Sequence, residues 1–313
     1  MPSRHLSCFV LSVALPLLTW ACDNEFSKGW LVDRTRVLAA RVEAAAEPSR
    51  ASLMPGEHAR VTWLVGAPNG TPSLAWSFAT CPAPGGFLPE LRCPNGAHKV
   101  GRGRADTEVV VMELDVPPAE IVADAQELLV LAAFCETGEP ELDPVRFEGT
   151  CSGGGAALLA SVNVRLAAAG PNANPRIADD DVSLDGVPTA PATARPSGPP
   201  CATNHESPIV VAGTEHTFGF TFRDDEREAV PDSPDGVETL LLSHTVTAGK
   251  LARQYSSLEP GETAPKHVTV SWTAPSRDEV GESGRLVELF FVLRDGRGGT
   301  AFTRRTVCVR RDP

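Results

Sequence analysis

The sequence predicts an all-β chain that folds into two tandem antiparallel β-sandwiches. Two observations support this fold class. Apolar residues recur at every second position in short segments along the chain, and clusters of Gly, Pro and Asp separate these segments. The chain has 313 residues. The part that follows its apolar N-terminal stretch, about 290 residues, suits two domains that each bury a core.

In the first half, the clearest strand follows the turn Pro55-Gly56-Glu57. Its apolar side chains share one face and its polar side chains share the other: Ala59, Val61, Trp63 and Val65 against His58, Arg60 and Thr62. Further strands are expected over 35–45, 74–79, 107–116, 127–135 and 156–167. Residues 119–131 also fit helical spacing, and at most a short helical turn is expected there.

The second half repeats this plan. Strands are expected up to Leu184 and then over 216–222, 237–247, 266–273, 287–293 and 302–309. The last two flank the turn Asp295-Gly296-Arg297-Gly298-Gly299. A glycine-rich turn between two alternating segments indicates a hairpin, because glycine adopts positive φ without strain.

The Pro-Gly-Glu turn before a strand and the late Asp-Gly-x-Gly-Gly hairpin resemble features of the immunoglobulin-like modules in bacterial cell-envelope lipoproteins, a largely uncharacterised family. The resemblance covers roughly residues 31–313. It implies immunoglobulin-like β-sandwiches and an envelope setting, and it implies no activity. The chain departs from antibody domains in two ways: it lacks their Cys–Trp–Cys spacing, and Tyr255 is the only tyrosine, so the tyrosine corner is missing.

The N-terminal sequence predicts an export signal. Arg4 precedes the apolar stretch Leu6–Ala21, which is shorter than the roughly 20 residues of a membrane span but fits a signal peptide. Residues 17–22, Leu-Leu-Thr-Trp-Ala-Cys, resemble the lipobox of bacterial lipoproteins, which implies that Cys22 is lipidated. The expected location is the cell envelope, with the outer membrane favoured over the inner. Ordinary cleavage after Ala21 would instead give a soluble secreted or periplasmic protein.

These signals predict the following division of the chain: signal peptide 1–21, lipid-anchored tether 22–31, first sandwich 32–168, linker 169–175, and second sandwich 176–313 with a Pro-rich loop at 186–200. The tether would reach at most ~40 Å. Phe26 and Trp30 would lie near the headgroups, and the second sandwich would face away from the membrane.

The cysteine count supports lipidation and three disulfides. Of eight cysteines, Cys8 leaves with the signal peptide, and lipid on Cys22 leaves an even number. No two cysteines have the two-residue spacing of a zinc site. In a sandwich, the strands that end at Cys81 and Cys135 would end at opposite poles, too far apart for crossed pairing. The expected disulfides are therefore Cys81–Cys93, Cys135–Cys151 and Cys201–Cys308.

The net charge of −12 disfavours a nucleic-acid partner. The acidic run Asp179, Asp180 and Asp181, just after the expected domain junction, is a weak calcium candidate, with a solvated turn as the alternative. No cofactor is expected. The sequence contains no nucleophile elbow, zinc-protease or phosphate-loop motif.

The sequence thus favours a non-catalytic envelope lipoprotein. Its loops would bind a protein or a surface glycan, and residues 136–150 and 186–200 are the candidate contact segments. A structural accessory subunit of an envelope or secretion assembly is one alternative. A hydrolase whose site is not visible in the sequence is the other.

Overall fold

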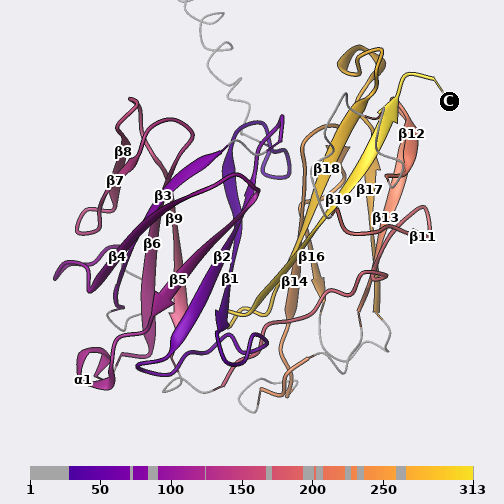
Figure 1. Ribbon diagram of the computed structural model, residues 1–313. Helices are drawn as coiled ribbons and strands as arrows, with labels where there is room; N and C mark the ends of the chain where they lie inside the picture. Colours follow the sequence, from indigo (N-terminus) through magenta and orange to yellow (C-terminus); the bar gives the residue numbers. More distant parts are fainter. Residues whose placement is uncertain are drawn as a thin grey trace, which may run out of the picture.

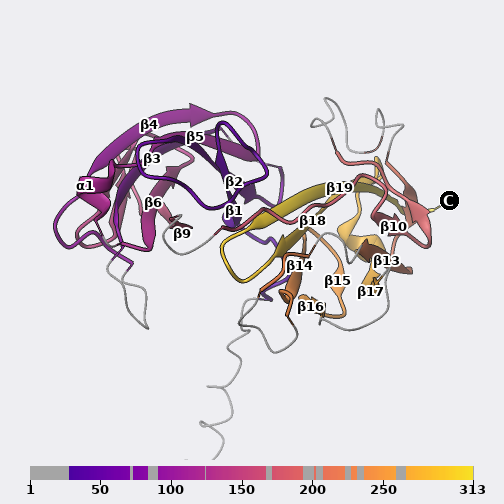
Figure 2. The same ribbon diagram turned by 90° about the horizontal axis from the view of Figure 1, so that it is seen from below.

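The computed structural model describes residues 28–70, 73–83, 91–123, 125–166, 171–192, 201, 207–222, 227–230, 236–258 and 266–312. Cys22, the expected signal peptide and most of the expected tether lie outside these residues. The predicted all-β fold class is confirmed: two β-sandwiches lie side by side (Figures 1 and 2). No helix of the described part of the chain is long and apolar enough to cross a bilayer.

The first sandwich contains two antiparallel sheets. One has the order β1-β2-β5, with bounds Arg36–Ala44, His58–Gly66 and Val109–Asp115. The other has the order β4-β3-β6-β9, with bounds Lys99–Ala105, Leu74–Pro82, Glu127–Cys135 and Leu158–Arg165. Between them, Trp63 packs edge-to-face on Phe134 at 5.9 Å between ring centroids. The expected helical turn is α1, Ala119–Val122.

Strand β4 was not predicted, because its sequence Lys-Val-Gly-Arg-Gly-Arg-Ala has no apolar alternation. Its glycines take the inward positions instead. A Cβ on Gly101 would lie 2.4 Å from the ring of Phe78, and one on Gly103 would lie 2.3 Å from the ring of Trp76. The aromatic rings of β3 thus fill the space that apolar side chains of β4 would otherwise occupy.

A small hairpin, β7 (Pro140–Asp143) and β8 (Glu148–Cys151), covers part of the outer face of the four-stranded sheet (Figure 1). Leu142 and Phe147 of this hairpin pack on a buried cluster composed of Cys81, Leu129 and Leu131 of the sheet and Cys93 of the segment before β4. The segment 136–150, expected to be a long loop, is therefore an ordered hairpin.

The second sandwich is larger. One sheet has the order β11-β10-β13-β17-β15, with bounds Val187–Pro188, Val182–Leu184, Glu215–Phe222, Lys266–Thr273 and Lys250–Leu251. The other has the order β12-β19-β18-β14-β16, with bounds Ile209–Val211, Thr300–Arg310, Arg285–Arg294, Leu240–Val246 and Tyr255–Leu258. All pairings are antiparallel except that of β12 with β19. The predicted hairpin is β18–β19.

The two sandwiches share a buried interface. An apolar cluster joins the outer face of the β1-β2-β5 sheet to that of β18: Val32, Ala39, Leu64, Phe290 and Val292. Beside it, Arg304 of β19, which is 7% exposed, forms ion pairs with Glu108 of the first sandwich at 3.1 Å and Glu288 of the second at 2.9 Å. Because apolar packing and a buried ion pair both cross this interface, the two sandwiches hold a defined orientation.

The segment before β1 pairs with the second sandwich. Val32 N donates to Val246 O at 2.8 Å, and Val246 N donates to Trp30 O at 2.9 Å. Trp30 packs against the core of the second sandwich rather than lying free near a membrane surface. Residues 30–32, where the expected tether meets the first sandwich, are therefore held on β14 of the second sandwich by apolar packing and main-chain pairing.

The structure contains all three expected disulfides, with Cα–Cα separations of 5.8, 5.8 and 5.3 Å. The register explains the pairing. Cys135 lies opposite Ala75 at the start of β3, whereas Cys81 lies near the end of that strand. These two cysteines are thus at opposite poles, as the sandwich prediction required, and each pairs with a cysteine of a nearby loop or hairpin.

Candidate functional site

The acidic run considered for calcium does not form a ligand set in the described part of the chain. Asp179 and Asp180 lie in a turn, and Asp181 Oδ2 accepts a hydrogen bond from Ala178 N at 2.5 Å. The buried Arg305 lies beside them, and its Nη2 donates to Asp179 O at 3.2 Å. Burial lowers the pKa of Arg305 to about 10, and the charges of Asp179 and Asp181 oppose this shift. A guanidinium thus already supplies the positive charge here.

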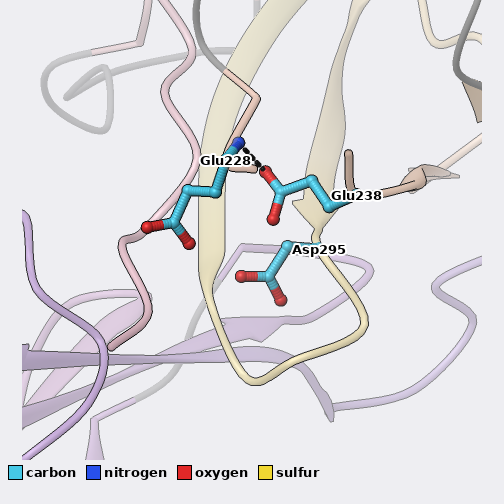
Figure 3. A group of neighbouring side chains, drawn as sticks. All are labelled: Glu228, Glu238 and Asp295. Carbon is cyan, nitrogen blue, oxygen red and sulfur yellow. Dashed lines mark hydrogen bonds between the residues drawn. The ribbon is translucent and has the colours of Figure 1, made fainter. Parts of the chain in front are cut away.

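A different acidic group gathers at the domain junction (Figure 3). Glu228 and Glu238 lie between β13 and β14, and Asp295 lies in the β18–β19 turn. Each contributes one carboxylate oxygen to a set within 4.8 Å of one another. Glu238 and Asp295 are 5% and 4% exposed. Arg297 faces the group, with Nη1 3.5 Å from Glu228 Oε2 and 4.0 Å from Glu238 Oε2.

The same carboxylates hold the linker. Glu228 Oε2 accepts from Ala173 N at 2.9 Å, and Asp295 Oδ2 accepts from Asn172 Nδ2 at 2.9 Å. Asn174 joins the sandwiches, because its Nδ2 donates to Val42 O at 2.7 Å and its Oδ1 accepts from Thr300 N at 2.9 Å. The junction group therefore lies where the linker meets the β18–β19 turn.

Burial dominates the electrostatics of the group. Burial raises the pKa of Glu238 to about 7, and the negative charges of Asp295 and Glu228 add to the rise, whereas the hydrogen bond from Glu228 N and the charge of Arg297 oppose it. Burial also raises the pKa of Asp295, although hydrogen bonds from Arg297 N, Asn172 and Gly299 N counteract the rise. Burial and the neighbouring carboxylates thus both oppose ionisation of Glu238, and Arg297 offsets this only in part.

Three described histidines contact a hydroxyl group, which is the pairing that a nucleophile needs. One of these pairs, His267 Nδ1 with Thr221 Oγ1 at 3.2 Å, is exposed on the surface. His216 Nδ1 lies 2.7 Å from Asp185 Oδ2, and its Nε2 lies 2.7 Å from Thr214 Oγ1. The Thr214 hydroxyl, however, also donates to Val211 O at 2.6 Å, so its proton points at the main chain. This geometry suits a cap on the end of β13 better than an activated nucleophile.

The remaining pair is inside the core. His244 Nε2 lies 3.0 Å from Ser256 Oγ, and His244 is 2% exposed. Its Nδ1 has no hydrogen-bond partner in the described structure, so no carboxylate orients the ring. Burial lowers the pKa of His244 to about 4, with a smaller effect in the same direction from Arg253. His244 therefore packs as a neutral imidazole against Phe291.

This lowered pKa predicts a pH dependence of stability. Below its ordinary value of 6.5, His244 binds a proton in the unfolded chain, whereas in the folded chain it does so only near pH 4. The free energy of unfolding should therefore fall as the pH drops from 6.5 to 4, by about 3 kcal/mol from this residue. Urea unfolding of the wild type and His244→Gln across this range measures the difference.

The variant should lose this part of the pH slope. The exposed His267 offers a matched control, and His267→Gln should keep the wild-type slope. Equal slopes for wild type and His244→Gln would contradict a neutral, buried imidazole.

Sequence reasoning missed the junction group. Asp295 was recognised only as a turn residue, and nothing in the sequence connects it with Glu228 and Glu238. The asparagines at 172 and 174, within the expected linker 169–175, were the available signal.

No model of a protein family matches the chain, and no curated protein matches it either. Among solved structures, the chain is similar to the crystal structure of red sea bream transglutaminase, with 12% sequence identity and a TM-score of 0.26. The similarity covers 89% of this chain and 32% of that one, so this chain spans about a third of that protein's length. A similarity of this size carries no conclusion about activity.

Proposed function

We propose that the chain is a non-catalytic, lipid-anchored protein of the bacterial cell envelope that binds another envelope protein through the β7–β8 hairpin. The observation that carries this proposal is the fixed conformation of the hairpin tip. Cys135–Cys151 closes its base, and Cys93 N donates to Pro144 O at 2.7 Å near its tip. Because Cys93 is itself bonded to Cys81, the tip is attached to a second disulfide.

The tip itself is a short turn with exposed side chains. Asp143 Oδ1 accepts from Val145 N at 2.9 Å and from Arg146 N at 3.2 Å, which fixes the turn. Val145 is 43% exposed, and the Arg146 side chain is 73% exposed. A preordered tip loses little conformational entropy on binding, so a small surface can support useful affinity.

A protein partner is favoured over a glycan. Phe147, the only aromatic residue of the segment 136–151, packs inward on the Cys81–Cys93 cluster. The exposed tip thus offers an aliphatic and a cationic side chain, which suit a protein surface, and no ring for a sugar to stack on. The second segment considered for binding, 186–200, is described only to residue 192 and adds no evidence.

Site-specific photocrosslinking in the native envelope tests this proposal. A photoreactive amino acid at position 145 should give one discrete protein adduct, and the adduct should be lost in the variant Arg146→Glu. The matched control is position 187, whose valine is 66% exposed on β11 of the second sandwich, and it should not give that adduct. No adduct from 145, or the same adduct from 187, would refute a binding role for the hairpin. A carbohydrate adduct would refute a protein partner.

The lipid anchor has its own test. Wild-type protein should sediment with membranes, and its intact mass should include acyl chains on Cys22. Cys22→Ser should release the folded protein into the soluble fraction, because the variant lacks the acyl chains. Each buried CH₂ of such a chain contributes about 0.8 kcal/mol to the free energy of membrane binding. A soluble wild-type protein with a free thiol at Cys22 would show that the anchor is absent.

A further inference from the structure

The junction group contains two buried oxygens without hydrogen bonds. Glu238 Oε1 accepts a hydrogen bond from Glu228 N at 3.1 Å. Glu238 Oε2 has no hydrogen-bond partner among the described residues, and it lies on the side of the carboxylate that faces Asp295 (Figure 3). Asn172 is 2% exposed, and its Oδ1 also lacks a partner, although its Nδ2 is bonded to Asp295. Each such buried acceptor costs about 1–3 kcal/mol, and more when it is charged.

A cation bound between the carboxylates would satisfy Glu238 Oε2, and the unpartnered Oδ1 of Asn172 belongs to the amide that is hydrogen-bonded to Asp295. If all three carboxylates are ionised, they carry three negative charges, which Arg297 and Arg227 together do not fully balance, so a cation would supply the remaining positive charge. Arg227 lies nearby, but its Nη1 donates to the main-chain carbonyl of Glu238 at 3.1 Å.

The spacing of the oxygens fits calcium. Calcium binds six to eight oxygens at about 2.3–2.6 Å in irregular geometries, so ligands on opposite sides of the ion lie about 4.8 Å apart. The three carboxylate oxygens lie within 4.8 Å of one another. No histidine or cysteine belongs to the group, which disfavours zinc, and magnesium requires a stricter octahedron at shorter distances.

The small size of Gly299 allows a further oxygen, the main-chain carbonyl of Ala173, to lie near Asp295. A Cβ at this position would lie 2.2 Å from Asp295 Oδ2 and 2.5 Å from Ala173 O. The absence of a side chain therefore lets the linker carbonyl of Ala173 approach the Asp295 carboxylate. A main-chain carbonyl is a common calcium ligand.

We propose that Glu228, Glu238, Asp295 and Asn172 form a calcium site that fastens the linker to the second sandwich. The linker residues Asn172 and Ala173 are bonded to two of these carboxylates, so an ion there would tie the linker, the segment before β14 and the β18–β19 turn together. Calcium sites of extracellular modules typically have dissociation constants of about 10⁻⁴–10⁻³ M, which matches an exported protein.

The test is calorimetric titration of the full-length exported chain with calcium chloride, after treatment with a chelator. One calcium ion should bind per chain, magnesium should bind more weakly, and millimolar calcium should raise the melting temperature. Glu238→Gln keeps the shape of the side chain but removes its charge, and it should weaken binding by about tenfold or more. The amide hydrogen of Ala173 should exchange more slowly with calcium than without it.

Two further variants make the outcome decisive. Asp179→Asn/Asp180→Asn removes acidic groups of the turn beside Arg305 and should bind calcium as the wild type does. Glu228→Gln, at a side chain 30% exposed, tests the site if Glu238→Gln does not fold, and it should also weaken binding. Absence of binding at millimolar calcium, or equal binding by wild type and the folded glutamine variant, would overturn the site.

The rival arrangement is a proton shared between Glu238 and a neighbouring carboxylate. In that case the wild type would not bind calcium, and Glu238→Gln in chelator would be at least as stable as the wild type at neutral pH. That result would overturn the calcium site.

Discussion

Replacing Trp272 with alanine should destabilise the second sandwich by about 3–5 kcal/mol, since truncation of a buried tryptophan removes apolar contacts and leaves a cavity. Trp272 is fully buried, and its ring lies 5.7 Å from that of Phe218. Its Nε1 also donates to Ala248 O at 3.1 Å, so the substitution leaves a buried carbonyl unsatisfied. Urea unfolding of wild type and variant, followed by circular dichroism, measures the loss.

Tyr255→Ala is the matched control for this substitution. Tyr255 also lies on a strand of the second sandwich, but it is 50% exposed, so its truncation should cost less than about 1 kcal/mol. A loss below about 1 kcal/mol for Trp272→Ala would contradict its place at the centre of this core.

Removal of the Cys201–Cys308 disulfide should have the largest effect of the three disulfides. Its cysteines are 107 positions apart, whereas those of the other two disulfides are 12 and 16 apart. In the chain-entropy account, the long loop contributes up to about 5 kcal/mol and each short one about 3 kcal/mol. The bond also fixes the chain just before β12, the parallel strand that pairs with β19 from Ile209 opposite Cys308.

Paired alanine substitutions measure this difference without leaving a free thiol. Cys201→Ala/Cys308→Ala should lower the free energy of unfolding more than Cys81→Ala/Cys93→Ala, and the second variant serves as the control. Equal losses, or a greater loss in the control, would show that loop length does not determine the contribution of these bonds.

Two strands have the bounds that the sequence predicted, one with a continuous apolar sequence and one with an alternating sequence. The structure places β6 at Glu127–Cys135 and β17 at Lys266–Thr273, as expected. The side chains of these strands themselves supply the buried apolar surface, so the local sequence is enough to predict them. Strand β4 was missed because its partner's aromatic rings fill its inward positions. The short strands β11 and β12 were missed because neighbouring strands hold them rather than a pattern of their own.

The junction group shows the limit of a local pattern more clearly. The sequence indicated that a calcium site could lie near the domain junction, but it pointed to Asp179, Asp180 and Asp181, because these are adjacent in the chain. The residues that converge come from two separate loops and the linker. Only the fold of the second sandwich, together with the course of the linker, brings them within reach of one another.

The pairing of Trp30–Val32 with Val246 has a mechanical consequence for a protein held by its N-terminus. A pull on the N-terminus would act first on the main-chain hydrogen bonds between this segment and β14. Only after those bonds break would the force reach β1 and the first sandwich. The second sandwich, although it comes later in the chain, would thus be the first to bear tension. The segment would detach from β14 before the core of either sandwich unfolds.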